Sequence, residues 1–110
     1  MVAPAAGSVV LVSFPFSDLS ASKLRPAIVL ASADRDDWIL CQVTSNPYAD
    51  PHAVQIGDAD FESGSLQRVS YARPGKLFTA NTSLMRPEAG RLKAAMLEHV
   101  RQSVISILRG

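Results

Sequence analysis

The alternation of hydrophobic and polar residues predicts a series of short strands followed by one helix. Runs rich in β-branched residues are separated by polar turns at intervals of about 8–12 residues. The predicted strands cover residues 9–14, 27–31, 38–43, 52–56, 66–71, 76–79 and 90–92. Residues 94–108 contain no Gly or Pro, and their apolar positions recur at spacings of three and four. Several short strands with one terminal helix are typical of a small, strongly bent barrel.

Proline, glycine and asparagine mark the ends of these strands. Asn46-Pro47 follows the third strand, and Pro74-Gly75 predicts a turn between the strands at 66–71 and 76–79. Phe61 is expected in a short loop. The helical stripe predicted to pack on the sheet consists of Leu97, Val100, Val104, Ile107 and Leu108.

Length and composition predict a single globular domain over residues 1–110. Apolar residues make up 47% of the chain and charged residues 19%, which is typical of a folded rather than a disordered protein. The only cysteine, Cys41, lies in an apolar run and is expected to be buried. No secretory segment opens the chain, and no apolar stretch reaches the ~20 residues that span a bilayer. We therefore expect a cytoplasmic protein without a membrane partner.

The net charge of +1 argues against a generally polybasic protein, but the charges are unevenly distributed. Acidic residues crowd positions 34–62, and basic residues dominate positions 68–93. Such an asymmetry can steer a polyanion to one face of a protein. A pair of solvated loops is the commoner explanation, and the sequence leaves both open.

Arg25 is the most conspicuous candidate for chemistry. It precedes Pro26 and the buried run 27–30, so both its backbone and its position at a strand end are restricted. A guanidinium held in this way can bind a phosphate through two hydrogen bonds, although an ion pair with a nearby Asp is equally compatible. Thr44-Ser45 follows the third strand, and adjacent strands would bring these hydroxyls to the same rim as Arg25. Ordinary turn hydrogen bonding is the alternative role for the two hydroxyls.

Other kinds of site find little support in the sequence. His52 and His99 are far apart, and no His or Cys pair has metal-ligand spacing. Phosphate-binding glycine loops and the Gly-x-Ser-x-Gly elbow are absent as well. The sequence therefore predicts no metal and no other cofactor.

Five segments of the chain form an ordered set of motifs: Gly7-Ser8-Val9-Val10-Leu11-Val12, Lys23-Leu24-Arg25-Pro26-Ala27-Ile28-Val29-Leu30, Cys41-Gln42-Val43-Thr44-Ser45, Ser63-Gly64-Ser65-Leu66 and Gly90-Arg91-Leu92. In this order they resemble landmarks of the MazF/PemK toxins, and the resemblance covers nearly the whole chain. The resemblance implies a mainly β fold, a small SH3-like barrel of the CcdB/MazF/PemK type with a C-terminal α-helix. It also implies a homodimer that a cognate antitoxin neutralises. Operator DNA would be contacted only through the antitoxin complex.

The resemblance further implies a metal-independent endoribonuclease, an mRNA interferase that cleaves single-stranded RNA by attack of the ribose 2′-OH. Arg25 matches the family arginine that stabilises the phosphate in the transition state, and Thr44 matches the threonine that assists it. The remaining RNA-binding candidates are Lys23, Ser45, Arg73 and Lys76. Two rival functions stay open: a non-enzymatic, CcdB-like toxin that binds a protein target, and a nucleic-acid-binding barrel without cleavage.

Two positions depart from the family pattern. Ser20 stands where many relatives carry a Glu five residues before the arginine, although Asp18 lies nearby. The stretch 71–76 differs from the Asp-Gln-containing segment of better-studied members. The general base and the cleavage sequence are therefore open.

Overall fold

The computed structural model describes residues 4–13 and 24–110, which form one curled sheet and one helix. The seven strands lie in the order β4-β6-β3-β2-β1-β7-β5, and all neighbours are antiparallel. Their bounds are Ser8–Ser13 (β1), Leu24–Asp34 (β2), Asp37–Thr44 (β3), Val54–Ile56 (β4), Phe61–Gly64 (β5), Ser70–Asn81 (β6) and Met85–Leu92 (β7). Two 3₁₀ turns, Asp58–Asp60 (η1) and Thr82–Leu84 (η2), precede β5 and β7, and the helix α1 spans Ala94–Arg109.

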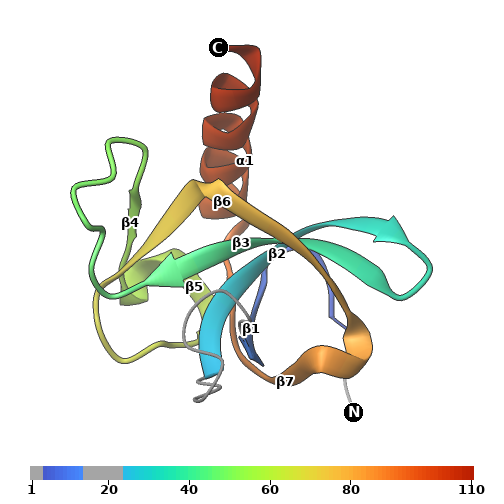
Figure 1. Ribbon diagram of the computed structural model, residues 1–110. Helices are drawn as coiled ribbons and strands as arrows, with labels where there is room; N and C mark the ends of the chain where they lie inside the picture. The colour runs from blue at the N-terminus through green and yellow to red at the C-terminus, as the bar shows by residue number, and fades with distance from the viewer. Residues whose placement is uncertain (1–3, 14–23) are drawn as a thin grey trace, which may run out of the picture.

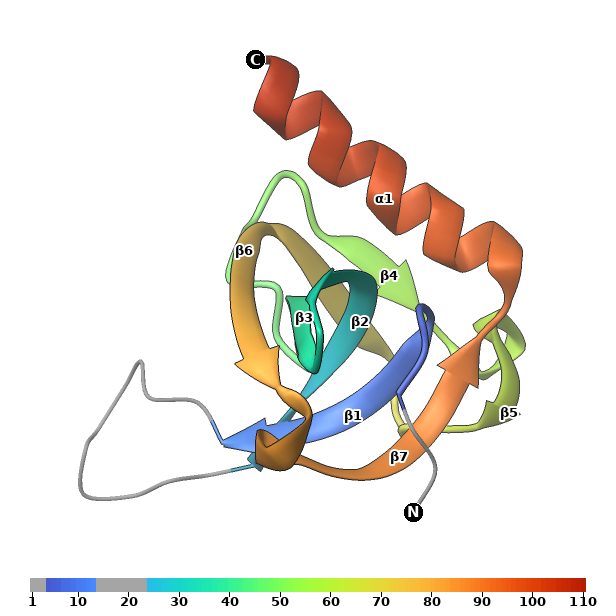
Figure 2. The same ribbon diagram turned by 90° about the vertical axis from the view of Figure 1, so that its right-hand side faces the viewer.

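Figures 1 and 2 show the strands curling into a half-barrel, with α1 lying across one side of it. The mainly β architecture with a C-terminal helix confirms the prediction from sequence.

Alternation along the strands divides the core into two clusters on opposite faces of the sheet. One cluster contains Ile28 and Cys41 together with the helix residues Leu97 and Val100, so it lies between the sheet and α1. The other has no helix residue and consists of Val10, Val12, Ala27, Val29, Leu40 and Ala80. The sheet is therefore apolar on both faces, which explains the continuous hydrophobic run in β2.

The helix packs on the first cluster through part of the predicted stripe. Leu97, Val100 and Val104 are buried, as predicted. Leu108 is 76% exposed, so its assignment to the packed stripe was wrong. The reason is visible in Figure 1, where the last turns of α1 extend beyond the strands. Arg101 adds a polar tether, because its Nη2 donates to the Leu30 carbonyl at 2.8 Å.

Strand β6 differs most from the prediction. It begins at Ser70 rather than at residue 66 and continues through Pro74-Gly75, which was wrongly predicted to be a turn. Val43 pairs with Ala72 and Cys41 with Leu77, so four residues of β6 lie opposite the single residue between them on β3. This bulge accommodates Pro74, which has no N–H to give to a regular ladder.

The other corrections concern short or extended strands. Phe61 lies at the start of β5, not in a loop, and is buried opposite Leu92. Strand β7 begins at Met85, several residues before the predicted strand at 90–92. The partner of Phe61 lies on β7, and the early residues of β7 pair with β1, so in neither place does the local sequence reveal the pairing.

Candidate active site

Arg25 and Thr44 lie at the shared end of β2 and β3, two residues beyond the last paired residues of the two strands. Ala27 pairs with Gln42 and Ile28 with Cys41 across these strands. Continued by two residues toward the strand end, this register sets Arg25 opposite Thr44. Directly opposed residues of an antiparallel pair have Cα atoms about 4.5–5.5 Å apart. The predicted meeting of the two candidates at one rim is thus supported by the strand register.

Both residues belong to the sheet face that points away from α1. Arg25 lies two residues before Ala27, and Thr44 lies four after Leu40, so alternation puts them on the face of the second core cluster. Arg25 is half-buried, and its other neighbour is Val12 of β1. On this face Arg25 therefore has Val12 beside it on β1 and Ala27 two residues along its own strand.

Thr44 is nearly buried, with 7% of its surface exposed. Its Oγ1 accepts a hydrogen bond from the Asn46 backbone N–H at 3.2 Å, which is the turn interaction considered from the sequence. This bond uses an acceptor lone pair of Oγ1, so the hydroxyl proton can still be donated to a ligand. Ser45 is the next residue along and is exposed.

Arg73 is held by an ion pair. Its Nε donates to Asp50 Oδ2 at 2.9 Å, and 18% and 11% of the two side chains are exposed. The guanidinium also lies over the Tyr48 ring, 5.6 Å from the centroid. The hydrogen bond from Arg73, helped by the His52 backbone N–H, lowers the pKa of the Asp50 carboxyl. This predicted RNA-binding residue thus also anchors the loop between β3 and β4.

The remaining sequence candidates lie at different places. Lys76 is exposed in the β6 bulge. Lys23, Ser20 and Asp18 lie outside the described residues, so their assignments stay predictions.

Comparison with known proteins identifies the family. A family model described as PemK-like, MazF-like toxin of type II toxin-antitoxin system matches residues 5–108. The chain belongs to this family. The match covers almost all of the chain and confirms the resemblance found in its motifs. A search of the curated proteins found no match.

Solved structures agree on the fold. MazF from Deinococcus radiodurans is 22% identical over 100% of both chains, with a TM-score of 0.77. A MazE–MazF structure from the same organism is 24% identical, with a TM-score of 0.76. The match covers 98% of this chain and 97% of that chain. A mycobacterial endoribonuclease in complex with its cognate antitoxin is 15% identical and covers 98% of this chain and 95% of that one, with a TM-score of 0.73.

Three residues of the β3–β4 loop in this MazF-like toxin were missed by the sequence analysis. They are Asn46, Tyr48 and Asp50. Asn46 Oδ1 accepts from the Tyr48 N–H at 2.9 Å, and Asp50 Oδ1 accepts from the His52 N–H at 2.9 Å. Asn and Asp side chains often accept from the backbone N–H two residues later and so favour turns. Asn46 and Asp50 were therefore the signal in the sequence that could have indicated an ordered turn here.

A cavity of about 700 Å³ opens on the other side of β1 from Arg25. Val12 pairs with Arg25 on one side and with Met85 on the other, and Met85 lines the cavity. Its full lining is Pro4, Val10, Thr82, Met85, Arg86, Pro87 and Glu88. Arg86 thus brings a further positive charge to the region beside the candidate site.

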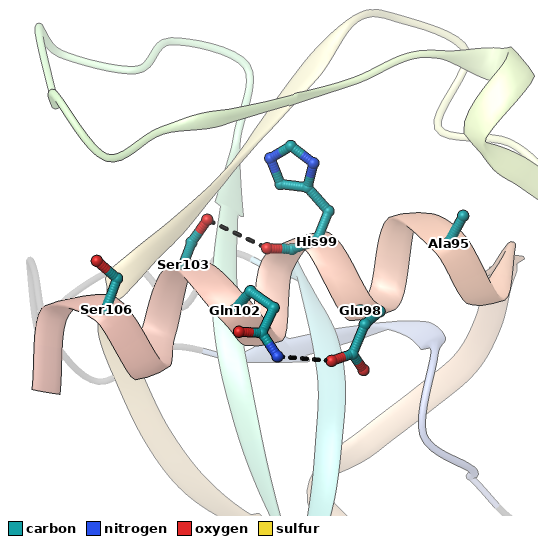
Figure 3. Close-up of a pocket in the computed structure, with 6 residues that line it drawn as sticks. All are labelled: Ala95, Glu98, His99, Gln102, Ser103 and Ser106. Atoms are coloured by element: carbon teal, nitrogen blue, oxygen red, sulfur yellow. Dashed lines mark hydrogen bonds between the residues drawn. The ribbon is translucent and has the colours of Figure 1, made fainter. Parts of the chain in front are cut away.

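A second hollow, of about 590 Å³, lies on the outward side of α1 and holds none of the predicted site residues (Figure 3). Three of its polar side chains are bonded within the helix: Gln102 Nε2 donates to Glu98 Oε2 at 2.8 Å, and Ser103 Oγ donates to the His99 carbonyl at 3.1 Å. These bonds are internal to the helix, so the hollow offers no constellation comparable to the strand-end site.

Across residues 4–13 and 24–110, no three His, Cys, Asp or Glu side chains gather as metal ligands. Cys41 is fully buried, and this burial raises the pKa of its thiol to about 12, so it has no role as a nucleophile. Within the same residues, no helix has the length and apolar character needed to cross a membrane.

Proposed function

We propose that this toxin is a metal-independent endoribonuclease that cleaves single-stranded RNA. The observation that carries the proposal is the strand register, which, continued to the strand end, sets Arg25 opposite Thr44 on the sheet face away from α1. A cation with planar, bidentate geometry beside a hydroxyl donor suits a phosphodiester that gains negative charge during reaction. The solved relatives named as MazF and as an endoribonuclease support the same chemistry.

The reaction begins with attack of the ribose 2′-oxygen on the adjacent phosphorus. The 2′-OH loses its proton, a pentacoordinate phosphate forms, and the bond to the 5′-oxygen breaks as that oxygen takes up a proton. The products are a 2′,3′-cyclic phosphate and a free 5′-hydroxyl. Since DNA has no 2′-OH, it is not a substrate.

Arg25 stabilises the charge on the non-bridging oxygens of the pentacoordinate phosphate, and the Thr44 hydroxyl donates to the same group. Both act from rigid strands rather than from a loop, so little reorganisation is needed as the charge develops. Since the guanidinium supplies the positive charge, the mechanism needs no divalent ion.

The active form is a homodimer that a cognate antitoxin inhibits. Leu24, at the same strand end as Arg25, is 49% exposed, and covering such apolar surface favours association. The antitoxin partner is supported by the relatives solved with MazE or with a cognate antitoxin. The antitoxin is expected to lay an acidic segment over the basic side of the site.

The decisive experiment incubates the purified protein with single-stranded RNA in EDTA and maps the new 5′ ends. We expect cleavage at defined sequences, with 5′-hydroxyl and cyclic-phosphate ends, and no cleavage of DNA of the same sequence. Activity that disappears with EDTA and returns with magnesium would overturn the mechanism. Growth inhibition without any RNA cleavage would favour a non-enzymatic toxin.

A further inference from the structure

The ring of Tyr48 is exposed beside the candidate site. Tyr48 lies four residues after Thr44, and 62% of its surface is accessible. A large aromatic side chain open to water on a surface loop gains little from burial there. Its position next to a nucleic-acid site suggests a contact with a ligand.

Two hydrogen bonds connect the Tyr48 backbone to Thr44 through Asn46. The Asn46 N–H donates to Thr44 Oγ1 at 3.2 Å, and the Tyr48 N–H donates to Asn46 Oδ1 at 2.9 Å. In each bond, a side chain fixes the backbone of the residue two positions later. The position of Tyr48 is consequently tied to the end of β3.

The side chain of Tyr48 is fixed from a second direction. Arg73 lies over the ring at 5.6 Å, and its guanidinium is held by Asp50 at 2.9 Å. The Asp50 N–H donates to the Pro47 carbonyl at 2.9 Å, which closes the loop around Tyr48. Both Tyr48 and Ala49 have positive φ, 53° and 58°, a conformation that turns the chain sharply at the ring.

We propose that the Tyr48 ring is a stacking platform for a nucleobase next to the scissile phosphate. The inference rests on the proposed function and adds a binding residue to it. Successive bases of single-stranded nucleic acid stack on aromatic side chains, and a guanidinium beside the ring adds cation–π attraction. Because one contact of the ring is with Arg73 and most of its surface is open, a base can stack on the accessible side.

The platform acts on affinity rather than on sequence. Every base has a π-face, so stacking tolerates different bases. It holds the strand so that the neighbouring phosphate reaches Arg25 and Thr44. Tyr48 is therefore a binding and positioning residue, not a catalytic one.

The test measures binding of short single-stranded oligonucleotides with 2′-fluoro sugars, which lack the attacking hydroxyl and stay intact. Each carries one 2-aminopurine, whose fluorescence falls on stacking. Tyr48→Phe keeps the ring and should bind like wild type with the same quenching. Tyr48→Leu keeps apolar surface without a π-face and should bind about fivefold to 150-fold more weakly, with the quenching lost.

The matched pair of variants separates stacking from loop structure. Thermal unfolding of Tyr48→Leu is measured in parallel, and the exposed Leu108→Ala on α1 controls for loss of apolar surface elsewhere. Equal affinity and quenching for wild type and Tyr48→Leu would overturn this inference while leaving the proposed function intact. If wild type bound no oligonucleotide and cleaved no RNA, the proposed function itself would fail.

Discussion

Arg73 of β6 and Asp50 of the β3–β4 loop form an ion pair, with Nε and Oδ2 2.9 Å apart. Both side chains are largely shielded from water, and the carboxylate also accepts from the His52 N–H. A basic residue expected from sequence to meet RNA therefore organises the loop that follows Thr44. We therefore expect a substitution of Arg73 to change RNA binding partly through this loop.

Asp50→Asn should lower the free energy of unfolding at neutral pH by about 1–2 kcal/mol. This lies between the contribution of an exposed ion pair and that of a buried hydrogen bond to a charged group. The pKa of Asp50 is lowered in the folded state, so its contribution is complete above the ordinary carboxyl pKa of about 3.9. That contribution is lost as the pH falls from there through the folded-state pKa. Urea unfolding at a series of pH values measures it, with the exposed Glu62→Gln as the control. Equal stability of wild type and Asp50→Asn at pH 7 would contradict the expectation.

Lys76→Glu should weaken the toxin–antitoxin complex by about fivefold and make its affinity less dependent on salt. Lys76 is exposed in the β6 bulge and is not engaged in the Arg73–Asp50 pair, so its charge can be reversed without loosening the loop. Arg109→Glu, at the end of α1, makes the same change of charge away from the site. Titration calorimetry at two salt concentrations measures the affinity of the antitoxin for each of the two variants. An equal loss for both variants would indicate a general charge effect rather than docking beside β6.

The sequence predicted the meeting of Arg25 and Thr44 because it required only that two successive strands be antiparallel neighbours. It did not predict the continuity of β6, because Pro74-Gly75 has the local chemistry of a turn and only the pairing with β3 turns it into a bulge. The assignment of Phe61 failed for the same reason, since its partner Leu92 is distant in the chain. The proposed role of Tyr48 depends on its contact with Arg73. A contact between residues distant in the chain leaves no pattern in the local sequence.

Cys41 should resist thiol reagents in the folded protein. It is fully buried, and burial raises its pKa to about 12, so hardly any thiolate exists near pH 8. We expect a colorimetric disulfide reagent to label no thiol in the native protein and one per chain in denaturant. Rapid native labelling at pH 8 would show that the sheet opens far more readily than its packing implies.

Gly64→Ala should destabilise the fold by about 2–3 kcal/mol. Gly64 has φ +70°, and a Cβ there would lie 2.3 Å from the Ala89 carbonyl oxygen and 2.5 Å from Gly90 Cα. Backbone atoms cannot yield as a flexible side chain can, so β5 would separate from β7. Gly57→Ala is the control, because nothing lies within 4 Å of its added Cβ. Similar denaturation midpoints for the two variants would disprove the close approach.

Arg25→Ala should lower the rate of the chemical step by about 10²–10³ while changing RNA affinity far less. The reason is that the charge it meets exists mainly in the transition state. Arg25→Lys keeps the charge but loses the bidentate fork, so it should stay strongly impaired. Single-turnover cleavage separates rate from binding, and circular dichroism checks the fold.

Thr44→Val should show a smaller defect of the same kind, and Thr44→Ser should restore most of the rate. The two variants differ in the hydroxyl, which accepts the Asn46 N–H and, in the proposed mechanism, donates to the phosphate. If Thr44→Val lost affinity rather than rate, the hydroxyl would act through the loop and not at the phosphate. An Arg25→Ala protein that folds and cleaves RNA at the wild-type rate would remove the proposed mechanism altogether, because in that mechanism Arg25 supplies the positive charge that meets the phosphate.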